Sequence, residues 1–352
     1  MTGFGRAKVV IQLVIGIAIL LWLLQLANSS EVLATVLEVN PLNLIGAVAF
    51  FVTASTFVAL ALSTTLRNSN PTVPLKKILM ASFAGQLLSD VTPVRSGYFM
   101  TPVILKQLAS IPVEQGLTGV LATGGINSLV KVAICLVGLA YFSSYLSLPV
   151  EITNALVVGV AVLFVAGSFL LLLMLNRRMP KLVAKLEKTP LIGKSLSKFI
   201  EMFSNVEQHG RKIRKSLIFV AILVLLSLLA NATALYLIFN SVWYPSLKLL
   251  DFFFLASFAS VLTYIPITIA GLGVQEAGYV LLLNLLLGFP LSTINPRFVA
   301  FALITRALFT GTDIIGVGPL LSAGFKPKGK DPLQEANYTQ IGTSTISGSQ
   351  QL

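Results

Sequence analysis

Hydrophobic residues are gathered into eight long runs, separated by shorter polar stretches. Six of the runs suit one crossing of a hydrocarbon layer about 30 Å thick, for which a helix needs about 20 apolar residues. They cover residues 8–27, 45–66, 117–140, 152–175, 216–239 and 297–321. The pattern therefore predicts an all-α polytopic membrane protein with about six full transmembrane helices.

The other two runs, 78–109 and 249–289, are too long for one crossing, and each is interrupted near its middle. The interruptions are Asp90-Val-Thr-Pro93-Val-Arg95-Ser-Gly97 in the first run and Pro266 to Gly273 in the second. Proline removes a backbone donor and glycine loosens a helix, so each interruption predicts a kink or a turn. Backbone opened at membrane depth must be buried in protein or face a water-filled cavity. We therefore predict two re-entrant, broken-helix hairpins.

The basic residues support this topology. If each interrupted run enters and leaves the membrane on the same side, most loop Lys and Arg residues fall on the side of Arg6 and Lys8. Only Lys248 and Arg297 remain in the outer loops. Since cytoplasmic loops carry an excess of positive charge, both termini are expected in the cytoplasm of a cell-membrane protein.

The same topology exposes an internal repeat. Residues 45–140 form a span, a hairpin and a span, and residues 216–321 repeat this order in the opposite orientation. Inverted repeats with interrupted helices are typical of secondary transporters, whose substrate site lies near the membrane midplane. We expect residues 1–321 to form the membrane domain, 176–215 a cytoplasmic amphipathic segment, and 322–352 a disordered cytoplasmic tail.

Composition narrows the function further. The chain has 352 residues, of which 55% are hydrophobic, and a formal net charge of +12. The positive charge lies in loops, where it suits anionic lipid headgroups, and no motif for nucleic-acid binding accompanies it. Cys135 and His209 are the only residues of their kinds, so we predict no disulfide, metal site or Ser-His-Asp triad. No cofactor is expected.

Charged residues inside the apolar runs are candidates for function, because each costs free energy in the membrane. Arg95, Arg306 and Lys131 are predicted to offer positive charge to an anionic headgroup, and arginine suits phosphate because its fork binds two oxygens. Glu276 is predicted to pair with an arginine, a coupling cation or a substrate amine. Asp90 and Asp313 are supporting charges, and the alternative is that all these groups only pair with each other. A further set, predicted to shape the cavity, comprises Pro93, Gly97, Tyr98, Pro266, Gly271 and Gly273.

Two stretches resemble a known family. IPITIAGLGVQEAG with the later LITRALFTG, and SDVTPVRSGYFMTPVILK earlier in the chain, resemble the signatures of the lysylphosphatidylglycerol synthase transmembrane region, also called the flippase-like membrane domain. The residues that carry this resemblance are Pro266, Gly271, Gly273, Glu276 and Arg306, with Pro93, Arg95 and Gly97 in the first half. Tyr98 and Thr101 depart from it, since bacterial members have an acidic residue and an arginine there.

The resemblance implies movement of an anionic lipid across the bilayer, either a phospholipid or a polyprenyl-phosphate-linked sugar. We expect no enzymatic activity and no complete lysylphosphatidylglycerol synthase, because a short polar stretch follows residue 321. The alternatives are a membrane-embedded transferase acting on a polyprenyl phosphate, and a scaffold for a separate transferase. A close carboxylate pair across a closed cavity would favour the enzyme, whereas a groove open to lipid would favour translocation.

Overall fold

The computed structural model describes residues 3–69, 71–93, 95–144, 149–176, 205–244, 246–264, 267–290 and 292–324, together with Leu146. Within these ranges the regular structure is helical, and six helices are long and apolar enough to cross a membrane. They are built on α1 (Gly3–Leu26), α3 (Pro41–Ser69), α6 (Val113–Ser143), α7 (Val150–Leu175), α10 (Leu217–Val242) and α13 (Pro296–Asp313). The protein is an all-α, multi-pass membrane protein, as the hydrophobic pattern predicts.

The long helices present apolar side chains outward. In α7 the exposed residues include Val158 and Phe164, and in α10 they include Ile218 and Phe219. Lipid tails are as apolar as these side chains, so such a surface is stable in a bilayer. Two of the helices extend further, α10 through the preceding turn η2 (Arg214–Ser216) and α13 through η3 (Ile314–Gly316) and α14 (Val317–Ser322).

Both interrupted runs fold back on themselves. The first forms α4 (Leu75–Asp90), the turn η1 (Ser96–Met100) and α5 (Thr101–Ala109); the second forms α11 (Leu249–Leu262) and α12 (Val274–Leu286). At 1.5 Å per residue the longest of these, α4, measures about 24 Å, which is too short to cross a 30 Å layer alone. Because α4 packs against α5 and α11 against α12, each run is a helical hairpin. The depth of the hairpins in the membrane and the inverted repeat stay predictions.

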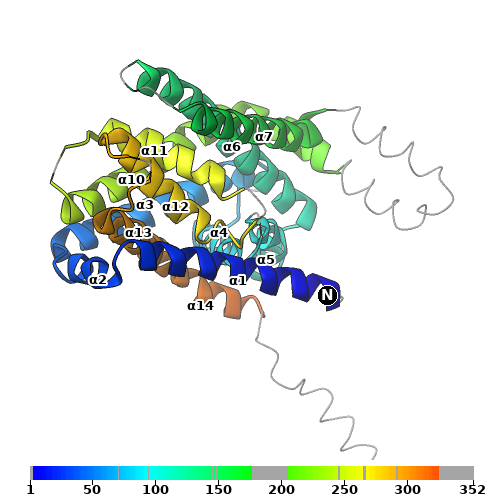
Figure 1. Cartoon of the computed structure of the whole chain (residues 1–352). Coiled ribbons are helices and arrows are strands. Elements are labelled where there is room, and N and C mark those ends of the chain that lie inside the picture. The colour runs from blue at the N-terminus through cyan, green and yellow to red at the C-terminus, as the bar shows by residue number, and fades with distance from the viewer. Residues whose placement is uncertain are drawn as a thin grey trace, which may run out of the picture.

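The helices form a bundle around α3 and α10. These two helices share the most extensive contact between the described elements, and Figure 1 shows α6 and α7 together on one side of the bundle and α1 on the other. α1 packs against the start of α12, because Gly273 has no side chain there. A Cβ on Gly273 would lie only 2.7 Å from the carbonyl oxygen of Gly16.

Some segments differ from the hydrophobic pattern or lie outside the structure. The short helix α2 (Ser29–Leu37) was not predicted, and it follows Asn28 in a left-handed conformation (φ 58°). Most of the predicted amphipathic segment 176–215 falls on 177–204, outside the described residues, as does the predicted tail beyond residue 324. Residues 205–213 are helical, and Val206 and Ile213 are buried against α6 and α7.

Candidate functional site

The two interruptions meet inside the bundle. Pro93 of the first lies opposite Ile269 of the second in an isolated antiparallel β-bridge. Only a short piece of extended backbone pairs here, because Pro93 has no N–H to donate and helices begin within a few residues on both sides. The contact brings together segments that are about half the chain apart in sequence, which no local pattern predicts.

Side-chain hydrogen bonds fix the backbone conformation of the first interruption. Arg95 adopts a left-handed conformation (φ 56°), which is uncommon for a residue with a Cβ. Ser89 Oγ donates to the Arg95 carbonyl oxygen at 3.1 Å, and the N–H of Gly97 donates to Thr92 Oγ1 at 2.6 Å. Gly97 is required by space, because a Cβ there would overlap the carbonyl of Leu88. Strain of this kind is typical of functional sites, where the surrounding contacts impose it.

The second interruption uses glycine instead. Ala270, Gly271 and Gly273 all have positive φ, at 46°, 75° and 80°. Gly271 also lies so close to α11 that a Cβ would be 2.8 Å from the Cα of Thr263. Glycine adopts these angles at no steric cost, so Gly271 and Gly273 suit this turn, whereas Ala270 carries a Cβ at positive φ.

Glu276 closes the second interruption and anchors an arginine. Its Oε2 accepts a hydrogen bond from the backbone N–H of Gly273 at 2.6 Å, which caps the start of α12. Its Oε1 forms a short ion pair with Nε of Arg306 from α13, and Arg306 Nη2 donates to the Gln275 side chain at 3.3 Å. Glu276 is 2% exposed, so the pair is desolvated. A carboxylate is favoured at this end of a helix, where the helix dipole is positive.

The first interruption holds a second group of charges. Arg95 Nη2 donates to Oδ1 of Asp90, the last residue of α4, at 2.9 Å. Asp313, the last residue of α13, lies with its carboxyl group within hydrogen-bonding reach of Asp90. The side chain of Asp90 is 3% exposed and Asp313 is 2% exposed. The sequence placed Arg306 and Asp313 on one face of a helix, and the structure gives them different partners, one at each interruption.

A polar cavity of about 50 Å³ lies between the interruptions. Three of the residues predicted to bind a headgroup, Arg95, Glu276 and Arg306, line it, and Arg95 also stacks over the ring of Phe309 at 5.1 Å. The other lining residues are Phe51, Asn231, Ala256, Gln275, Tyr279, Thr305 and Phe309. The volume holds a few waters, whereas ligand pockets span about 300–1,000 Å³. The cavity must therefore widen before a ligand of that size can enter.

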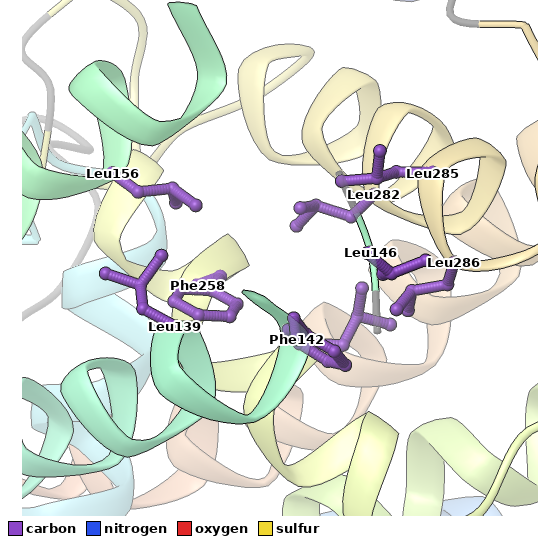
Figure 2. A pocket seen from close by; sticks show the side chains of 9 residues that line it. Leu139, Phe142, Leu146, Leu156, Phe258, Leu282, Leu285 and Leu286 are labelled. Carbon is purple, nitrogen blue, oxygen red and sulfur yellow. The ribbon is translucent and has the colours of Figure 1, made fainter. Parts of the chain in front are cut away.

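A second cavity has the wrong chemistry for a charged ligand. Figure 2 shows Leu139 and Phe142 of α6, Leu156 of α7, Phe258 of α11, and Leu282, Leu285 and Leu286 of α12 around it, with Leu146 beside them. All of these side chains are hydrocarbon, and the space measures about 10 Å³. It offers no charge or hydrogen bond, so the candidate site is the polar cavity.

Other predicted residues lie elsewhere. Lys131 is buried in α6 with its amine 5.8 Å from the centre of the Tyr264 ring, and it is not part of the cavity wall. Tyr98 packs with α4 and α5 in a separate hydrophobic cluster. Pro266 lies outside the described residues. Within the described part of the chain, no group of three or more His, Cys, Asp or Glu residues could hold a metal ion.

Sequence reasoning missed several residues of the cavity wall. Asn231 had a usable signal, since it is a polar residue in the middle of the apolar run LLANATALY. Thr305 and Phe309 lie within one helical turn of Arg306. Thr and Phe are common in buried helices, so neither residue type indicates a site by itself. Phe51 had no signal, because it is one of many apolar residues in its helix.

Comparison with known proteins agrees with this architecture. The family model described as the lysylphosphatidylglycerol synthase TM region matches residues 9–311, which include both interruptions and every residue of the cavity wall. A comparison with curated proteins finds no match. The chain therefore belongs to the family of the lysylphosphatidylglycerol synthase transmembrane region, and its function is membrane-embedded and related to lipid.

Proposed function

We propose that the protein moves a lipid with an anionic headgroup, a phospholipid or a polyprenyl-phosphate-linked sugar, across the bilayer through the polar cavity. The observation that carries this proposal is the presence of two guanidinium groups, Arg95 and Arg306, on one cavity between two interrupted helices. Interrupted helices at membrane depth are the usual way in which transporters present polar groups to a substrate. The family membership supports a lipid as that substrate.

The two arginines keep capacity for a phosphate. The hydrogen bonds of Arg306 to Glu276 and Gln275 use its Nε and Nη2, and a guanidinium has five N–H groups in all. Arg95 is held by Asp90 and by the face of Phe309, and its side chain is 23% exposed. A headgroup phosphate would replace part of these contacts with bidentate bonds, which are among the strongest that arginine forms.

The experiment uses the purified full chain in liposomes that contain fluorescent analogues of a phospholipid or a polyprenyl phosphate. Dithionite quenches only the outer leaflet, so its progress reports movement between leaflets. We expect wild type to move one class of analogue, and the double variant Arg306→Gln with Glu276→Gln, which removes both charges so that neither is left unpaired, to lose that movement. Arg297→Gln, on the exposed start of the same helix, is the matched control and should retain it. Absence of movement with every analogue in folded wild-type protein would reject the proposal.

A second candidate is a membrane-embedded transferase acting on a polyprenyl phosphate. The observation in its favour is the close pair of carboxyl groups of Asp90 and Asp313. Neither residue is part of the cavity wall, and Arg95 lies against the pair, so a substrate in the cavity meets the arginine rather than the carboxyl groups. Covalent conversion of the polyprenyl analogue during the liposome assay, detected by mass spectrometry, would favour this candidate over translocation.

A further inference from the structure

The carboxyl groups of Asp90 and Asp313 are buried together with an unusual shortage of donors. Oδ2 of Asp90 and Oδ1 of Asp313 are inaccessible to solvent, and neither accepts a hydrogen bond from any N–H or O–H of the described residues. The two groups nevertheless lie within hydrogen-bonding reach of each other. Two carboxylates only accept hydrogen bonds, so this contact becomes a hydrogen bond when one of them carries a proton.

The charges of Asp90, Asp313 and Arg95 also favour one bound proton. Asp90, Asp313 and Arg95 would together carry one excess negative charge if both carboxyl groups were ionised. An uncompensated charge in a buried site is strongly disfavoured, and a pair of carboxyl groups in contact commonly shares one proton. One proton makes the cluster neutral.

The backbone adds to this preference at Asp90. Asp90 ends α4, so its carboxyl group lies at a helix C-terminus, where the helix dipole is negative. Asp313 lies where α13 continues into η3. Gly316 of η3 allows this segment to approach α4 closely, because a Cβ there would overlap the carbonyl oxygen of Phe83. This packing holds the segment that carries Asp313 against α4.

No other ionisable group in the described residues supplies the missing positive charge. The ionisable side chains near Asp313 are Asp90 and Arg95, and those near Arg95 also include the phenols of Tyr264 and Tyr279, which supply no positive charge. Arg306, on the same helix as Asp313, is paired with Glu276. Lys76 and Lys77 are at the far end of α4, and Lys106 is exposed in α5. Tyr98 of η1 packs in the neighbouring hydrophobic cluster.

We propose that Asp90 and Asp313 form a proton-binding site in which the two carboxyl groups share one proton, and that Arg95 links this site to the polar cavity. Arg95 lines the cavity and donates to Asp90, while its Nε is buried and makes no hydrogen bond to the described residues. An anion in the cavity draws the charge of Arg95 away from the carboxyl pair, which then holds its proton more tightly. By linkage, the bound proton favours the anion to the same extent. This coupling rests on the proposed function, whereas the proton site does not.

Infrared difference spectroscopy of the purified full chain tests the proton site without any lipid movement. A protonated carboxyl group gives a carbonyl stretch that shifts in D₂O and disappears in alkaline buffer. We expect this band in wild type at neutral pH, and its shift on labelling aspartate with ¹³C at the side-chain carboxyl. Asp90→Asn and Asp313→Asn should each lose it, because the remaining carboxylate then pairs with Arg95. Asp251→Asn, which removes another buried aspartate, should keep it.

Several results would overturn the proposal. Absence of an aspartate-labelled band in wild type would do so without any variant, even if a variant failed to fold. A band that persists in either Asp90→Asn or Asp313→Asn would show that the proton is not shared. A band that sodium removes at constant pH would assign the pair to a metal cation instead. If the band behaves as expected but the dithionite assay shows no lipid movement, the proton site stands and the proposed function fails.

Discussion

At the first interruption the described residue with positive φ is an arginine, and at the second two of the three such residues are glycines. The first keeps its cation in its own loop, since Arg95 pairs with Asp90 only five residues away. The second has a carboxylate but no cation, and it takes Arg306 from α13, 30 residues later. The first thus gathers two carboxyl groups at the C-terminal end of α4, one of them from α13, while the second places a carboxylate at the favourable N-terminal end of α12.

We infer different tasks for the two interruptions from this difference. A negative helix end with an excess carboxyl group suits a proton or another cation, and a helix N-terminus with an arginine suits an anion. α13 contributes to both interruptions, because Arg306 and Asp313 lie two turns apart on it and have partners at different interruptions. Movement of α13 would therefore change the proposed proton site and the proposed anion site together.

The largest expected effect is the loss of the ion pair at the second interruption. Arg306→Ala leaves the carboxylate of Glu276 buried without its cation, which should lower stability by roughly 3–5 kcal/mol. Adding Glu276→Gln removes the unpaired charge, so the double variant should recover much of the loss. Thermal unfolding in detergent checks this, with Arg297→Ala as the control on the same helix. Equal destabilisation in the single and double variants would contradict the burial argument.

The next effect separates turns that need glycine from a helix position that does not. Gly271→Ala places a Cβ at positive φ and against Thr263, which should cost roughly 1–3 kcal/mol. Gly97→Ala should lose at least as much, because its Cβ overlaps the backbone of α4. Gly311→Ala in α13 has open space around it and should be neutral or stabilising by up to about 1 kcal/mol. The ranking of the three thermal midpoints is the measurement.

A smaller effect tests whether side chains hold the first interruption. Thr92→Val keeps the shape of the side chain but removes the acceptor for the N–H of Gly97 and the donor to the Leu88 carbonyl. We expect a loss of about 1–3 kcal/mol, since a buried N–H is left without a partner. Thr233→Val is the matched control, because its hydroxyl also donates to a backbone carbonyl, that of Leu229, but lies in α10, which belongs to neither interruption. A stability equal to wild type would show that the backbone alone sets the conformation of Arg95.

The smallest effect concerns Lys131, which sits over Tyr264 beside the second interruption. Lys131→Met retains the apolar stem and removes a cation–π contact worth about 0.5–2 kcal/mol. Because Lys131 is not in the cavity wall, we expect lipid movement in the dithionite assay to stay close to the wild-type rate. Loss of movement in a folded variant would extend the anion site from the cavity to α6. It would also weaken the contrast between the two interruptions.

The sequence by itself determined the number of membrane-crossing helices, the positions of both interruptions and the identity of three charged residues in the cavity wall. These features are local: a run of apolar residues needs a lipid environment whatever its neighbours, and Pro, Gly and charge disturb a helix wherever they occur. Only the tertiary structure decided that Pro93 meets Ile269, that Arg306 pairs with Glu276 while Asp313 faces Asp90, and that Lys131 lies outside the cavity. Such pairings depend on the rotation and depth at which helices pack, and hydropathy along the chain carries no record of either.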